Sequence, residues 1–113
     1  MIYCFDIDGV ICKTDKLNYR SSQPIKQAIK VINDLHSKGH TIKLFTGRYS
    51  KKGKMNKNKI KSIDNGMTKK QLKKWNVKFH SLYFGKPVYD LYIDDKNYNF
   101  SKRWYVNFRP NND

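Results

Sequence analysis

Two carboxylates stand two positions apart at the end of the first apolar run of the chain. Residues 2–7 are rich in β-branched and aromatic side chains, which predicts a β-strand buried on both faces. Asp6 and Asp8 lie at its carboxyl end, and Gly9 then allows the backbone to turn sharply. Alternate residues of an extended chain project to the same side. We therefore expect both carboxylates to face a crevice beyond the carboxyl end of the strand, where open α/β sheets bind ligands.

Three further predicted strands also end in polar groups. These groups are Thr46, Gly47 and Arg48 after residues 40–46, Lys86 after residues 79–84, and Asp94 and Asp95 at the end of residues 89–94. Parallel strands would bring all of them to one edge of a sheet. Four carboxylates would repel one another there unless a cation lay among them, and oxygen ligands of this kind suit Mg²⁺. A lysine, an arginine and a threonine hydroxyl could bind the oxygens of a phosphoryl group, so the pattern indicates phosphoryl transfer.

The elements that would position these groups alternate between strand and helix. Pro24 suits the first turn of a helix, and Gly39 is placed to end it. Between them the apolar residues recur at helical spacing, at Ile25, Ala28, Ile29, Ile32 and Leu35. This helix would join the strands at residues 2–7 and 40–46 through a right-handed crossover, which makes those strands parallel. The polar segment 13–23 should form a loop or flap above the site.

The second half of the chain is less regular. Residues 49–58 are typical of a mobile loop, and Ile60 and Ile63 indicate a short helical turn. A capping box at Thr68 and Gln71 predicts a short helix through Trp75. Residues 104–108 could add an edge strand. We see no domain boundary, and a chain of 113 residues predicts a single domain over residues 1–113.

Charge and cysteine usage narrow the class of protein. The formal net charge is +15, and residues 51–78 hold eleven lysines and one acidic residue, Asp64, which predicts attraction to phosphorylated or other anionic partners. Only Cys4 and Cys12 are present, which excludes a disulfide framework and zinc-type ligand spacing. No leader pattern and no membrane-length apolar run is present, so we expect a soluble, cytoplasmic protein without membrane contact.

The four strand-end motifs together resemble those of the haloacid dehalogenase (HAD) superfamily of phosphohydrolases. The matching segments are Phe5-Asp6-Ile7-Asp8-Gly9-Val10, Leu44-Phe45-Thr46-Gly47-Arg48, Gly85-Lys86-Pro87 and Tyr92-Ile93-Asp94-Asp95, in the order of that superfamily. The resemblance implies a three-layer, Rossmann-like α/β fold with a central parallel sheet. The connections are too short for a large cap domain, so the chain is similar to the small capless members.

The resemblance also implies a role for each matching residue. Asp6 would attack phosphorus and form an aspartyl-phosphate, and Asp8 would act as general acid and then general base. Thr46 and Lys86 would stabilise the transferring phosphoryl group. Asp6 and the backbone carbonyl of Asp8 would bind Mg²⁺ together with Asp94, Asp95 or both. Gly47 would also bind the phosphate, whereas Arg48 could contact it or form a surface salt bridge.

The substrate remains open between two enzymatic alternatives and one of another class. A small phosphorylated metabolite, such as a sugar phosphate or nucleotide, is the first choice. The lysine-rich stretch 51–78 could instead bind a nucleic-acid end, because Thr46-Gly47-Arg48 and Ile93-Asp94-Asp95 also resemble the 3′-phosphatase module of polynucleotide kinase-phosphatases. A basic binding module without catalysis is the third hypothesis, although lysines mixed with asparagine and glycine are often only a solvated surface.

Overall fold

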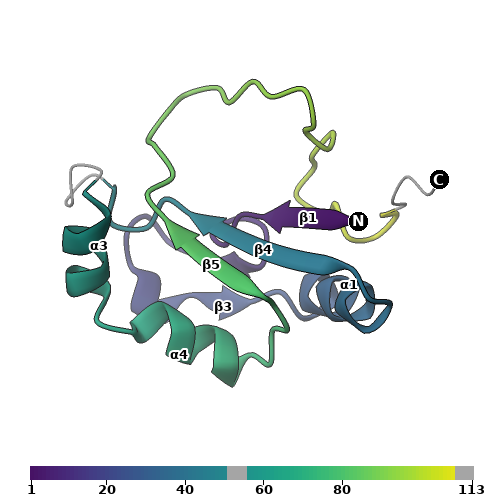
Figure 1. Ribbon diagram of the computed structural model, residues 1–113, viewed down its shortest axis with the longest axis horizontal. Helices are drawn as coiled ribbons and strands as arrows, with labels where there is room; N and C mark the ends of the chain where they lie inside the picture. The colour runs from purple at the N-terminus through teal and green to yellow at the C-terminus, as the bar shows by residue number, and fades with distance from the viewer. Residues whose placement is uncertain (51–55, 109–113) are drawn as a thin grey trace.

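A parallel three-stranded sheet forms the centre of the protein (Figure 1). The computed structural model describes residues 1–50 and 56–108. Strands β1 (Ile2–Phe5), β4 (Thr41–Thr46) and β5 (Ser81–Phe84) lie in the order β1-β4-β5. Ile2 pairs with Thr41, and Lys43 pairs with Ser81. Since all three strands run parallel, their carboxyl ends share one edge of the sheet, and the predicted α/β class with a central parallel sheet is confirmed.

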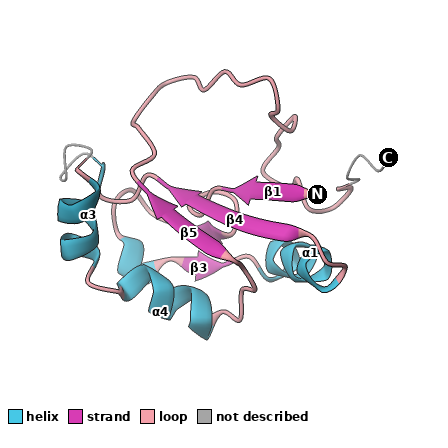
Figure 2. Cartoon of the chain, viewed as in Figure 1, coloured by secondary structure: helices cyan, strands magenta, loops and turns pink. Residues whose placement is uncertain are grey.

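Helix α1 (Lys26–Ser37) connects β1 and β4, as the sequence predicts (Figure 2). Its buried residues are Ala28, Ile29, Ile32 and Leu35, which form the predicted apolar stripe. They pack into one core with Ile42 and Leu44 of β4. Each large aliphatic side chain buried in this way contributes about 1.5–3 kcal/mol. Gly39 follows the helix with φ +92°, which is the left-handed conformation expected of a residue that ends a helix.

The segment between β1 and α1 is an ordered flap. Strand β2 (Cys12–Lys13) pairs antiparallel with β3 (Gln23–Pro24), and the 3₁₀ helix η1 (Tyr19–Ser21) lies between them. The side chains of Ile11 and Cys12 are fully buried in the core. The loop or flap predicted over residues 13–23 is therefore held against the body of the protein at its base.

Two short helices occupy much of the chain between β4 and β5. Residues 51–55, half of the loop predicted at 49–58, lie outside the described residues. Helix α3 (Lys57–Asp64) and helix α4 (Met67–Lys74) are joined through Asn65 and Gly66, both with positive φ. The capping box predicted at Thr68 is wrong, because α4 begins before it. The Thr68 amide instead donates to the buried carboxylate of Asp64, at 3.2 Å from Oδ2. The Asp64 carboxylate, on the preceding helix, thus accepts a hydrogen bond from a backbone amide in the first turn of α4, which has no partner within the helix.

The prediction that β1 is buried on both faces is also wrong. Tyr3 and Phe5 face the core, whereas Ile2 is 66% exposed and Cys4 is exposed. The burial alternates along the strand. One face of β1 is therefore open to solvent in the described structure, and a run of apolar residues overstated how much of the strand is covered.

The predicted strand over residues 89–94 does not form. Figure 1 shows the chain leaving β5 in a long excursion away from the sheet before it returns near β1. Only four residues, 85–88, separate β5 from that segment. A crossover between parallel strands needs about a dozen or more residues, so this connection is too short to add a parallel strand.

The predicted edge strand over residues 104–108 is a series of turns instead. Trp104 is buried, and its ring packs 5.5 Å from that of Phe5. Its Nε1 donates to the carbonyl of Val10 at 3.2 Å. The segment thus returns to the core through one aromatic anchor. None of the described helices is long and apolar enough to cross a membrane.

Candidate functional site

Asp6 and Lys86 form an ion pair at the carboxyl edge of the sheet. Asp6 directly follows β1, and Lys86 lies two residues after β5. Lys86 Nζ donates to Asp6 Oδ2 at 3.3 Å, and the Ile7 amide donates to Asp6 Oδ1 at 2.8 Å. The Asp6 side chain keeps 32% of its surface exposed, so a ligand can reach it from solvent. The structure thus places a partly exposed carboxylate and an ammonium group where the sequence predicts both.

The loops after β4 and β5 are tied together beside this pair. The Lys86 amide donates to the carbonyl of Thr46 at 3.2 Å, and Ser50 Oγ donates to the Lys86 carbonyl at 2.8 Å. A Cβ on Gly47 would lie 3.2 Å from the same carbonyl, which explains why glycine suits this position. Thr46 is fully buried, and its Oγ1 accepts from the Arg48 amide at 3.1 Å.

Asp8 forms a bidentate ion pair with Arg48. Arg48 Nε donates to Asp8 Oδ2 at 2.9 Å, and Arg48 Nη2 donates to Asp8 Oδ1 at 2.9 Å. Thr14 Oγ1 in the flap also donates to Oδ1, at 2.5 Å. Planar bidentate pairing of this kind fixes the carboxylate more firmly than a lysine could. Asp8 keeps 26% of its side-chain surface exposed, so solvent can reach its carboxylate.

Arg48 does not take either of the positions that the sequence suggested for it. Its side chain is fully buried, which excludes a surface salt bridge. Its Nη1 donates to Gln71 Oε1 at 2.6 Å and to Thr68 Oγ1 at 3.2 Å. With every nitrogen of the guanidinium directed at a protein acceptor, the predicted phosphate contact of Arg48 does not fit the structure. The side chain instead connects Asp8 to helix α4.

Burial and charge act in opposite directions on the Asp6–Lys86 pair. Desolvation raises the pKa of Asp6 above its usual value, and this outweighs the lowering effect of Lys86. Burial by itself would lower the pKa of Lys86, but Tyr89 and Asp6 outweigh it, so that the pKa of Lys86 is raised. Lys86 therefore keeps its positive charge beside the partly desolvated Asp6 carboxylate. Perturbed pKa values in neighbouring groups of this kind are typical of functional sites.

Two tyrosines that the sequence analysis did not assign to the site enclose Lys86. The ammonium nitrogen lies 5.5 Å from the ring centre of Tyr89 and 5.4 Å from that of Tyr92. The two rings pack on each other with centres 5.1 Å apart. Both distances to the ammonium fall within the range of a cation–π interaction. Only the spacing of two aromatics shortly after Lys86 could have suggested this contact.

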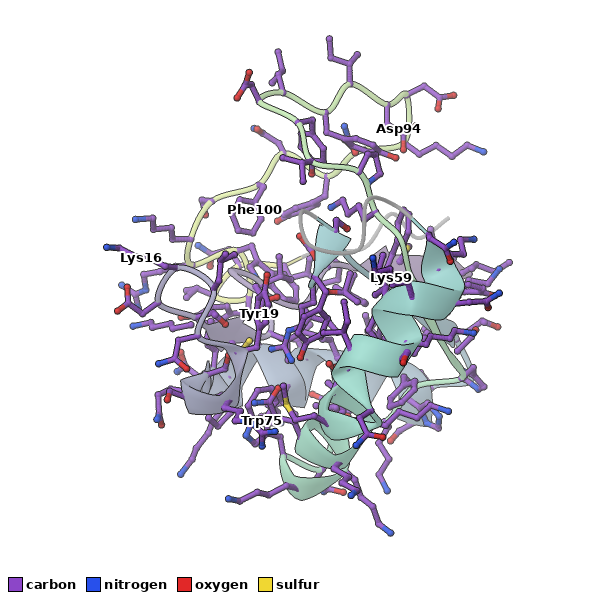
Figure 3. The ribbon with its side chains drawn as sticks, turned by 90° about the vertical axis from the view of Figure 1, so that its left-hand side faces the viewer. Lys16, Tyr19, Lys59, Trp75, Asp94 and Phe100 are labelled. Atoms are coloured by element: carbon purple, nitrogen blue, oxygen red, sulfur yellow. The ribbon has the colours of Figure 1, made fainter. Side chains whose placement is uncertain are left out.

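Asp94 and Asp95 are not brought to Asp6 and Asp8. Both are exposed and lie on the excursion after β5, and Figure 3 shows Asp94 at its outer part. Within residues 1–50 and 56–108, no group of three or more His, Cys, Asp or Glu side chains could hold a metal ion. The two carboxylates that do meet at the edge are already engaged by Lys86 and Arg48. To complete the predicted Mg²⁺ site, Asp94 or Asp95 would have to approach Asp6, and no step below is routed through a metal.

Comparison with known proteins supports the fold. No protein-family model matches the sequence, and no curated protein matches it. A crystal structure of a target protein from Vibrio cholerae superposes with a TM-score of 0.79 at 25% identity, covering 86% of this chain and 81% of the other. The chain has a HAD-like fold.

A second solved structure is more distant. It is the D,D-heptose 1,7-bisphosphate phosphatase from B. bronchiseptica, complexed with magnesium and phosphate. The TM-score is 0.50 at 12% identity, and the alignment covers 74% of this chain but 48% of that chain. This likeness shows the fold alone, and this chain spans about half of that enzyme.

Proposed function

We propose that this protein is a phosphomonoester hydrolase that uses Asp6 as its nucleophile. The observation that carries the proposal is the partly exposed Asp6 carboxylate, 3.3 Å from Lys86 at the carboxyl edge of a parallel sheet. A nucleophilic carboxylate beside a fixed cation suits attack on a phosphoryl group, because the cation offsets the charge that develops on the phosphoryl oxygens. The likeness to a HAD-like phosphatase structure supports the same reaction class.

The reaction would proceed in two steps. An Asp6 oxygen forms a bond to phosphorus while the ester P–O bond breaks, and Asp8 supplies the proton that the leaving alcohol takes up. Water then attacks the aspartyl-phosphate, gives its proton to Asp8 and releases inorganic phosphate. Asp8 Oδ2 accepts from Arg48 Nε, whereas Oδ1 also accepts from Thr14, so Oδ2 is the oxygen better placed for proton transfer. We assign Gly47 and Lys86 to the phosphoryl oxygens; Thr46, which the sequence also assigned to them, is fully buried and would position the loop through its bond to the Arg48 amide.

The substrate that we propose is a small phosphorylated metabolite, a sugar phosphate or a nucleotide. Phosphate release should be measured from a panel of sugar phosphates, nucleoside monophosphates and a 3′-phosphorylated oligonucleotide. We expect turnover of one class of small phosphate well above the others. Turnover of the oligonucleotide alone would replace this substrate class, and no release from any member would overturn the hydrolase proposal.

The Mg²⁺ requirement predicted from the sequence is tested in the same assay. Chelation with EDTA should abolish phosphate release, and added Mg²⁺ should restore it. The double variant Asp94→Asn and Asp95→Asn should weaken the Mg²⁺ response if these residues reach Asp6 during turnover. Release that EDTA leaves untouched would remove the metal from the proposal.

The Tyr89–Tyr92 pair should position Lys86 for this reaction. A cation–π contact of this kind contributes about 0.5–1 kcal/mol at an exposed site, so Tyr89→Leu should lower kcat by roughly two- to fivefold. The change should fall mainly on kcat rather than KM, because Lys86 acts on the transferring phosphoryl group. Tyr83→Leu is the matched control, since Tyr83 is similarly exposed and lies 6.0 Å from Lys43 instead. Equal effects of the two variants would contradict the positioning role.

A further inference from the structure

Helices α3 and α4 present a surface of one charge. Their exposed lysines, here called the lysine face, are Lys57, Lys59, Lys61, Lys69, Lys70, Lys73 and Lys74. The only acidic residue of these two helices is Asp64, which is 5% exposed and bonded to Thr68. Figure 3 shows α3 and α4 facing the viewer with their side chains extended into solvent. Neither helix therefore has an exposed carboxylate that would neutralise the positive charge of the lysine face.

The lysine face begins beside the candidate site. A Cβ on Gly85 would lie 3.2 Å from two carbons of the Lys57 side chain, so Lys57 runs along the backbone next to Lys86. Helix α4 carries the charge onward from there, because it follows α3 after two residues. Exposed lysines thus occur on both helices, from Lys57 beside the candidate site to Lys74 at the end of α4.

The end of α4 borders a groove that is lined in part by Trp75. A cavity of about 480 Å³ lies between α1 and α4, lined by Lys26, Lys30, Lys74 and Trp75 among others. The Trp75 indole is partly exposed there, and Figure 3 labels it at this end of the helix. The one carboxylate on the groove, Asp34, forms an exposed pair with Lys30 at 3.3 Å, which is a weak interaction in water. The groove therefore has a net positive charge, from Lys26, Lys30 and Lys74 against Asp34, beside a partly exposed aromatic side chain.

We propose that the lysine face and the α1–α4 groove bind single-stranded nucleic acid. Phosphates would lie along the lysines, and a base would enter the groove against Trp75, since aromatic stacking and a basic track are the two components of single-strand binding. A membrane surface fits less well, because the residues that α4 would need to insert, Thr68 and Leu72, are buried in the protein. Binding at this surface does not require the phosphatase activity.

The test uses the full chain and a labelled oligothymidylate of about ten nucleotides. A face variant carries Lys69→Gln, Lys70→Gln, Lys73→Gln and Lys74→Gln. A control variant carries the same change at four exposed lysines elsewhere, Lys16, Lys38, Lys96 and Lys102. Both lose the same net charge, so a difference between them reports position. We expect the face variant to bind at least tenfold more weakly, with a salt slope smaller by up to about 3, and the control to bind nearly as the parent does.

Fluorescence provides a second readout. Trp104 is buried, so quenching on addition of the oligonucleotide should come from Trp75 and disappear in Trp75→Phe, while the phosphate contacts of that variant remain. Dextran sulfate, a polyanion without bases, should bind without quenching. Equal weakening of the face and control variants would overturn the proposal, as would binding of the oligonucleotide with no quenching of the parent. Because binding is measured without turnover, failure of the phosphatase proposal leaves this result readable.

Discussion

Replacing Asp6 with asparagine should reduce phosphate release by at least about 10⁴-fold, the scale of effect seen when a covalent nucleophile is removed. Asparagine has nearly the shape of aspartate, and its oxygen can still accept from the Ile7 amide at the position of Asp6 Oδ1. The amide cannot form the acyl phosphate. The loss should therefore appear as a fall in kcat with the fold retained, measured by phosphate release and circular dichroism.

The covalent intermediate gives this prediction a direct measurement. Brief mixing of the parent with substrate, followed by acid quenching and mass spectrometry, should reveal a phosphorylated protein that is absent from Asp6→Asn. Asp15→Asn is the matched control, because Asp15 is an exposed carboxylate of the flap. It should turn over as the parent does. Phosphorylation that persists in Asp6→Asn would place the nucleophile elsewhere.

The sequence predicted the parts of this site that depend on local pattern. Asp6 follows an apolar run, Thr46 ends another and Lys86 follows a third, and parallel pairing then brings the three strand ends together. The parallel relation of β1 and β4 follows from the hydrophobic pattern and the single crossover helix between them, both of which are visible in one sequence. The strand order β1-β4-β5 and the register were not predicted and come from the structure.

The parts that failed depend on geometry beyond the local pattern. Residues 89–94 have the composition of a strand, yet a connection of four residues cannot carry the chain back to begin a parallel strand. Asp94 and Asp95 accordingly lie apart from Asp6 in the described structure. The four-residue connection is visible in the sequence, and its length alone argues against a parallel strand over residues 89–94. The partners of Arg48, which come from the flap and α4, could not be read from any local spacing.

The buried Arg48 is the residue whose loss should most damage the fold. Arg48→Met keeps much of the side-chain volume but leaves the Asp8 carboxylate without its two bonds from the guanidinium. Removing one partner of a buried ion pair costs about 3–5 kcal/mol. That is a large share of the roughly 5–15 kcal/mol that stabilises a domain. We expect Tm to fall by roughly 10–20 °C in thermal unfolding, with loss of activity through the displaced Asp8.

A double variant separates the charge from the packing. If the cost arises from the unpaired Asp8 carboxylate, then the double variant Asp8→Asn and Arg48→Met should lose less free energy of unfolding than the two single variants lose together. The expected coupling is about 0.5–3 kcal/mol. Arg48→Lys should not restore the parent stability, because an ammonium cannot reproduce the bonds that the planar guanidinium donates to Asp8, Thr68 and Gln71. Arg20→Met, at an exposed arginine of the flap, should shift Tm little. If Arg48→Met were as mild as Arg20→Met, Arg48 would not be the buried link between Asp8 and α4, and Asp8 would need another means of being held beside Asp6.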